Sequence, residues 1–135
     1  MQQMEAGGEV IQFTIDLPPR SKKNSQKIVV NKKTGRPFIM YSDAYKAYRK
    51  AALALIHMNG AVPISEPVNV KCVYYMPTRR ACDLTNLLEA TDDILVDAGV
   101  LADDNYNVVG GHDGSRVLVD KDHPRTEITI TKLRG

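Results

Sequence analysis

The chain has 135 residues, of which 43% are hydrophobic and 25% are charged, and its formal net charge at pH 7 is +2. This length accommodates the core of one globular domain and excludes a second one. No apolar run approaches the roughly 20 residues that cross a bilayer, so we expect no association with a membrane.

The cysteines and histidines indicate a reduced protein without a zinc site. The two cysteines, Cys72 and Cys82, have no histidine at metal-ligand spacing, and the three histidines are scattered along the chain. The N-terminus does not resemble a signal segment. We therefore expect a cytoplasmic protein rather than a secreted one held by disulfides.

The first half of the chain predicts a strand, a basic hairpin and a helix. Residues 1–9 are polar and are expected to be flexible, and residues 10–17 alternate as a strand that ends at Pro18-Pro19. A donor-rich loop over 20–27 precedes a hairpin whose strands, 28–30 and 37–41, flank a basic turn. Ser42 can cap a helix over 43–57 that ends at Asn59-Gly60. Its inward stripe is Tyr45, Tyr48, Ala52, Leu53 and Ile56, so the tyrosines are expected in the core, with base stacking as the alternative.

The second half predicts a central strand, a helix and three further strands. Residues 68–76 alternate up to Pro77, and a helix follows with Asp83 as its N-cap and Gly99 after its end. Strands are expected at 106–109, 116–119 and 126–133, with a flexible glycine-rich turn at 110–114. Together these elements predict a single α+β domain over residues 1–135, α/β-like in part, with a small mixed β-sheet packed against two main helices.

Charge is separated along the chain. Residues 20–50 carry ten Lys or Arg and one acid, whereas residues 79–104 hold seven of the sixteen acids. Such asymmetry favours a polyanion on one surface and a cation on another, although a solvated lysine-rich loop is the alternative.

The acids of the second helix are spaced to share a face. Residues three and four apart lie on one side of a helix, which places Asn86, Glu89, Asp93 and Asp97 together, opposite an apolar side. Like charges at this spacing disfavour the helix unless a cation lies among them. Spacing alone favours an ordinary solvated acidic face. Asp103 and Asp104 follow on a short connection, where we expect them to fold back towards Asp83.

The motifs of this half occur in a recognisable order: Arg79-Arg80, then Asp83-Leu84-Thr85-Asn86-Leu87, then Asp93-Ile94-Leu95, Ala98-Gly99 and Asp103-Asp104. This order resembles the RusA family of phage and prophage Holliday-junction resolvases, whose signature is a basic pair, D-L-D-N-L, D-A-L, A-G and a D-D pair. A weaker similarity in PPRSKKN, TGRPFI and the Tyr-rich basic helix extends it over most of the chain.

The resemblance implies Mg²⁺-dependent cleavage of DNA, with Mn²⁺ as a possible substitute. Asp83 and Asp104 match acids that the family uses for metal, and carboxylates from separate elements suit a hard ion that activates water. Thr85 replaces a second family Asp, and Glu89 replaces a Lys, so we expect Glu89 to restore the lost charge as a ligand. Asp103 is a further candidate ligand, and Asn86 and Asp93 are expected to support the site.

The implied partners are branched DNA, such as a four-way junction, and a second copy of the chain, because paired nicks in a two-fold symmetric junction suit a homodimer. Candidate phosphate contacts are Lys22, Lys23, Lys32, Lys33, Arg36, Arg79 and Arg80. Two alternatives stay open: a branched-DNA-binding protein that Thr85 and Glu89 have weakened as an enzyme, and a protein-interaction module with no role in nucleic acid binding.

Overall fold

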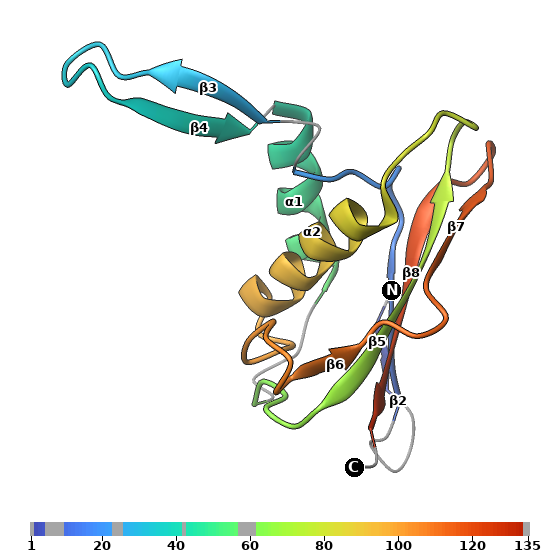
Figure 1. Ribbon diagram of the computed structural model, residues 1–135. Helices are drawn as coiled ribbons and strands as arrows, with labels where there is room; N and C mark the ends of the chain where they lie inside the picture. Colours follow the sequence, from blue (N-terminus) through green and yellow to red (C-terminus); the bar gives the residue numbers. More distant parts are fainter. Residues whose placement is uncertain (1, 5–9, 23–25, 42, 57–61, 134–135) are drawn as a thin grey trace.

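The computed structural model shows a mixed β-sheet with two helices on one of its faces and a separate hairpin (Figure 1). It describes residues 2–4, 10–22, 26–41, 43–56 and 62–133. The elements are β1 (Gln2–Met4), β2 (Val10–Ile15), β3 (Gln26–Val30), β4 (Pro37–Tyr41), α1 (Asp43–Leu55), β5 (Val68–Met76), α2 (Leu84–Asp97), β6 (Val109–Gly111), β7 (Arg116–Val119) and β8 (Arg125–Lys132). The predicted α+β fold is confirmed. None of the helices in these residues is both long and apolar enough to cross a membrane.

The order of the strands decides which loops meet. β8 lies between β2 and β5 and runs antiparallel to both, so β2 and β5 run in the same direction. The other edge of β5 pairs in parallel with β6 near its start and with β7 near its end. Because β2 and β5 are parallel, the loops that follow them, 16–21 and 77–83, leave the sheet at the same end.

The core lies between one face of this sheet and the two helices. The side chains of a strand alternate between its faces, and the register aligns the buried ones into three rows across the central strands. These rows are Ile11–Ile130–Val70, Phe13–Ile128–Cys72 and Ile15–Thr126–Tyr74, and all nine residues are buried. The helices cover the rows with apolar stripes, and Tyr45 and Tyr48 of α1 are core residues as predicted.

A buried hydrogen bond fixes α2 over β5. Tyr74 Oη and Thr91 Oγ1 are 2.7 Å apart, and the Thr91 hydroxyl also donates to the Leu87 carbonyl at 2.9 Å. A buried hydroxyl without a partner would cost about 1–3 kcal/mol, so this pair disfavours sliding of the helix along the sheet.

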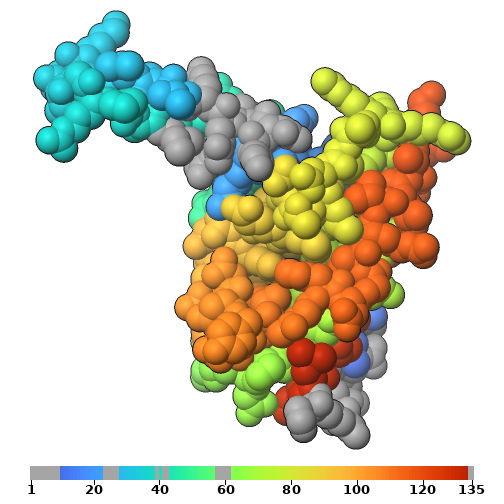
Figure 2. Space-filling view, viewed as in Figure 1, coloured from blue at the N-terminus to red at the C-terminus, as the bar shows by residue number. Residues whose placement is uncertain are grey.

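The β3–β4 hairpin projects from the body as an arm (Figures 1 and 2). Its strands pair only with each other among the described strands. At the tip, Asn31 Oδ1 accepts hydrogen bonds from the backbone of Lys33 and Thr34, and Gly35 adopts a φ of 70° that L side chains rarely take. The predicted hairpin with a basic turn is confirmed.

Gln2–Met4, in the segment expected to be flexible, form β1, which is antiparallel to β2. One expectation about the strands was wrong. Residues 106–109 were expected to be a strand, but backbone bonds from Val108 and Val109 to the Asn105 carbonyl form a turn there, and β6 begins only at Val109. The predicted helix cap at Ser42, the last turn at His57 and the stop at Asn59-Gly60 lie outside the described residues.

Candidate functional site

Asp83 is the N-cap of α2, on the segment that connects β5 to this helix. Its Oδ1 accepts hydrogen bonds from Thr85 N at 3.0 Å and from Thr85 Oγ1 at 2.6 Å. A carboxylate at this position satisfies an N–H group of the first helical turn and lies in the favourable field of the helix N-terminus. The predicted cap is confirmed, and Thr85 orients the Asp83 carboxylate through its backbone and its hydroxyl.

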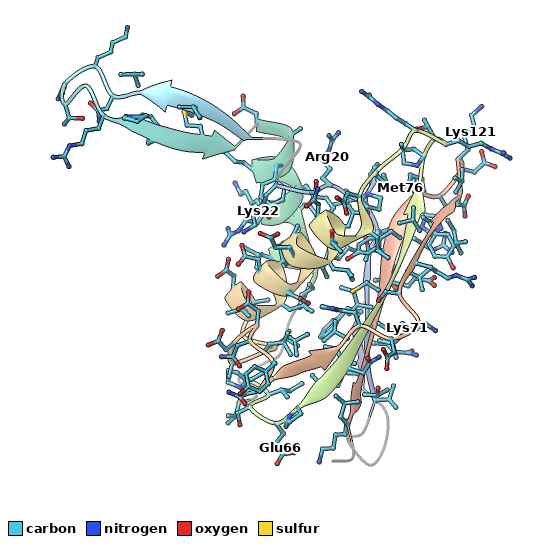
Figure 3. All side chains as sticks on the ribbon, viewed as in Figure 1. Arg20, Lys22, Glu66, Lys71, Met76 and Lys121 are labelled. Atoms are coloured by element: carbon cyan, nitrogen blue, oxygen red, sulfur yellow. The ribbon has the colours of Figure 1, made fainter. Side chains whose placement is uncertain are left out.

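A cavity of about 550 Å³ opens beside Asp83, where the loops after β2 and β5 meet. Both loops contribute a basic residue, Arg20 from the first and Arg80 from the second. The full lining is Pro18, Pro19, Arg20, Ser21, Met76, Pro77, Thr78, Arg80, Ala81, Cys82, Asp83 and Leu87. Figure 3 shows Arg20, from the loop after β2, and Met76, the last residue of β5, at this end of the sheet. The exposed carboxylate of Asp83 therefore borders a hollow that also holds two guanidinium groups.

The acidic face of α2 is partly neutralised by the basic half of the chain. Lys22 forms an ion pair with Asp93, and Arg49 of α1 forms one with Asp97. These cations relieve the repulsion that the spacing of the acids predicts, without any metal ion. Asp93 therefore ties the loop after β2 to the helix, and its supporting role at the site stays a prediction.

Asp103 and Asp104 belong to a second acidic group, together with Asp92 and His112. Asp92 is buried on α2, its Oδ2 lies 2.8 Å from His112 Nε2, and its Oδ1 has no hydrogen-bond partner among the described residues. Asp103 Oδ1 accepts from the Asp104 backbone N–H at 2.7 Å. Desolvation, the hydrogen bond with Asp103 and the charges of Asp103 and Asp92 together raise the pKa of Asp104. The hydrogen bond with Asp92 raises the pKa of His112.

The second acidic group lies further along α2 than Asp83 does. Asp104 interacts with Asp92, which follows Asp83 by nine positions, so roughly 14 Å of helix separates the two levels at about 1.5 Å per residue. Backbone bonds between Ile64 and residues 100–102 hold the connection beside the second half of α2. The expected return of Asp103 and Asp104 towards Asp83 is therefore not what the structure shows.

The donor types of these acidic residues suit a hard divalent ion. Carboxylate oxygens are the ligands that Mg²⁺ prefers. Among the described residues, no three His, Cys, Asp or Glu side chains are arranged to hold a metal ion. Glu89 is exposed on α2, six residues after Asp83, which turns it by about 120° and shifts it by about 9 Å along the axis.

The predicted basic contacts fall into two regions. Lys32, Lys33 and Arg36 lie exposed at the tip of the arm, and Arg79 and Arg80 lie exposed before α2. Lys22 is engaged with Asp93, and Lys23 lies outside the described residues.

Two residues of these groups, Asp92 and His112, were missed by sequence reasoning. Arg20 begins the donor-rich loop predicted over 20–27, and it reaches the cavity only because β2 and β5 are parallel, which the sequence does not reveal. Asp92 had a detectable signal, since it follows Leu88 by four positions and precedes Leu95 by three, which places an acid on the apolar stripe. His112 was discounted because its partner is an aspartate on another element and no metal spacing marks it.

Taken together, a cap carboxylate beside two arginines, at the end of a mixed sheet, defines a site suited to a phosphate-containing substrate. The family model of endodeoxyribonuclease RusA matches residues 16–131, and the chain belongs to this family. Membership implies a Holliday-junction-resolving endonuclease that binds branched DNA. No curated protein matches the chain.

Proposed function

We propose that this protein is a Mg²⁺-dependent endodeoxyribonuclease that resolves four-way DNA junctions by paired, symmetric nicks as a homodimer. Beyond family membership, the supporting observation is the oriented carboxylate of Asp83 beside a cavity that carries Arg20 and Arg80. Arginine forks bind phosphate oxygens, and the adjacent carboxylate is the type of group that holds a divalent ion.

The test is a strand-cleavage assay on a four-way junction beside a linear duplex of the same sequence. We expect nicks at symmetric positions in two opposing strands of the junction, a requirement for Mg²⁺, and little cleavage of the duplex. Asp83→Asn should reduce cleavage roughly a hundredfold or more while junction binding persists. Equal cutting of both substrates, or cutting unaffected by chelation of divalent ions, would contradict the proposal.

The proposed homodimer can bring Asp104 of one copy to Asp83 of the other. Within one copy, Asp104 interacts with Asp92, which lies further along α2 than Asp83 does. We propose this exchange as the arrangement in which the two family-matched carboxylates share a metal.

A second candidate function is branched-DNA binding with weakened cleavage. Thr85 donates its hydroxyl to Asp83 where the resembled family has another carboxylate, and Glu89 points away from the Asp83 direction. These features favour a site with one charge fewer than the family pattern.

Thr85→Asp and Glu89→Gln separate the two candidates. If Glu89 compensates for Thr85, Glu89→Gln weakens the response to Mg²⁺ and the additional Thr85→Asp substitution restores it. If Glu89→Gln leaves cleavage and the Mg²⁺ titration unaffected, the compensation is absent. A protein that shifts the junction on a gel and leaves every strand intact is the binder.

A further inference from the structure

The cavity beside Asp83 is lined by two chemically different sets of side chains. Its volume of about 550 Å³ falls within the roughly 300–1,000 Å³ range of small-molecule sites. Both loops contribute to each set. The apolar set, called the apolar wall below, consists of Pro18, Pro19, Met76, Pro77 and Leu87, and the polar set, called the polar wall, includes Arg20, Ser21, Thr78, Arg80 and Asp83.

The walls are built from restrained segments. Both loops have proline where they turn away from the sheet, and proline fixes its own φ. The loops therefore lose little conformational entropy when a ligand binds. Ser21 is buried, and the neighbouring Lys22 is tied to α2 through Asp93. The cavity is therefore a formed feature of this end of the sheet.

These walls match the two halves of a nucleotide. A guanidinium group binds a phosphate through paired N–H donors and can also stack on a base. Flat apolar surfaces accept the ring of a base or a sugar. A small inorganic anion would leave the apolar wall unused, and a base stacked within a duplex cannot enter a hollow of this kind.

We infer that this cavity receives one unstacked nucleotide of the branched DNA, with its phosphate bound by Arg20 and Arg80 and its base or sugar against the proline-rich wall. The inference rests on the proposed function and adds a source of selectivity to it. Taking a nucleotide out of the stack costs least where stacking is already interrupted, as at a branch point. The cavity then favours junctions over continuous duplexes before any bond is cut.

The experiment uses four-way junctions with 2-aminopurine placed in turn at each nucleotide flanking the branch point, with the full chain and EDTA present. The fluorescence of this base rises when it leaves the stack, and EDTA separates binding from cleavage. We expect a severalfold rise at one position with the unsubstituted protein. Ala81→Phe, which fills the cavity without removing a charge, should abolish most of this rise while the protein still shifts the junction on a gel.

Arginine substitutions test the phosphate contact against a matched control. Arg20→Ala and Arg80→Ala should each weaken the fluorescence response, with a loss of affinity of roughly tenfold. Arg116→Ala removes the same side chain from the exposed surface of β7, outside the cavity, and should behave as the unsubstituted protein does.

The outcomes distinguish this inference from the function on which it rests. If the protein binds and nicks the junction but no position gives a rise, or if the rise persists in both Ala81→Phe and Arg20→Ala, the nucleotide cavity is refuted and the proposed function stands. If the protein binds no junction even at low salt, the proposed function fails and the cavity inference fails with it.

Discussion

At the scale of single residues, buried Asp92 and half-buried His112 form a pair that is partly withdrawn from solvent. A buried carboxylate disfavours its charged form unless a partner compensates, and His112 Nε2 supplies that partner at 2.8 Å. The pair also lies next to Asp104, so its charge influences an acid that matches the family's metal ligands.

The Asp92–His112 pair predicts a dependence of stability on pH. Because the pKa of His112 is raised above its ordinary value of 6.5, protonation favours the folded state. The stabilisation is fully present below the ordinary value and is lost as the pH rises through the raised one. We expect the free energy of unfolding, measured with urea, to fall as the pH rises above the ordinary histidine value of 6.5, and His112→Gln to remove most of that slope.

His123 provides the matched control for this prediction. It also pairs with an aspartate, Asp16, but both side chains are more than half exposed. His123→Gln should leave the slope nearly unchanged, because solvent screens exposed pairs. Equal slopes for the unsubstituted protein and His112→Gln would contradict the assignment.

For substitution of Asp104, we expect opposite effects on the stability of the fold and on cleavage activity. Its pKa is raised, so the folded state disfavours its charge, and its stabilising effect is lost as the pH rises through that pKa. At neutral pH, Asp104→Asn should therefore raise the free energy of unfolding slightly, by less than about 1 kcal/mol because the side chain is exposed, and raise the melting temperature accordingly, while cleavage is lost. Asp113→Asn, at another exposed aspartate, serves as the control for both measurements, and a destabilised Asp104→Asn protein would refute the argument.

How far the sequence predicts the site depends on whether a residue acts through neighbours along the chain or across the fold. The Asp83 cap and the left-handed Gly99, with a φ of 80°, were predictable because both depend on local backbone geometry. The position of Asp104 was not, because it depends on the pairing of Ile64 with residues 100–102, a contact between distant segments. For the same reason, Arg20 was absent from the predicted contacts.

At the scale of elements, alternation and helical periodicity predicted β2, β5, β8 and both helices, since each has one buried face. β1 and β6 have three residues each, too few for a pattern to be detected, and pairing with neighbouring strands decides their existence. The arm is the converse case, since the sequence predicts its hairpin but not its role.

The arm exposes more apolar surface than an isolated ribbon can sustain. Its cross-strand register places Val29 beside Phe38 on one face and Val30 beside Pro37 on the other, and Ile28 and Val30 are 77% and 58% exposed. A two-stranded hairpin is at best marginally stable in water. We therefore expect the second copy of the proposed homodimer to cover it.

The double substitution Ile28→Lys and Val30→Lys tests this role of the arm. We expect it to convert a dimer into a monomer in analytical ultracentrifugation without a change in the melting of the body, because the arm strands pair only with each other among the described strands. Leu133→Lys, at another exposed apolar residue, is the control. A substituted protein that stays dimeric would show that the interface lies elsewhere.

At the scale of the whole molecule, the proposed sharing of a metal ion between copies would make the homodimer part of the active site. If a metal ion is shared by Asp83 of one copy and Asp104 of the other, each dimer has two such sites. Asp83→Asn and Asp104→Asn homodimers are then both inactive, because every site has lost one ligand.

Mixed dimers of these two variants distinguish sharing between copies from assembly within one copy. With sharing, one site of the mixed dimer loses both carboxylates and the other keeps both, so nicking of a junction returns, in one strand rather than in an opposing pair. With assembly within one copy, every site keeps a single carboxylate and the mixture stays inactive. Co-expression with two different affinity tags isolates the mixed dimer. A dimer of two Asp83→Asn copies, one with each tag and purified in the same way, controls for contaminating nuclease. Recovery of single nicks would also explain why paired nicking needs two intact copies, since each cut uses a carboxylate from both.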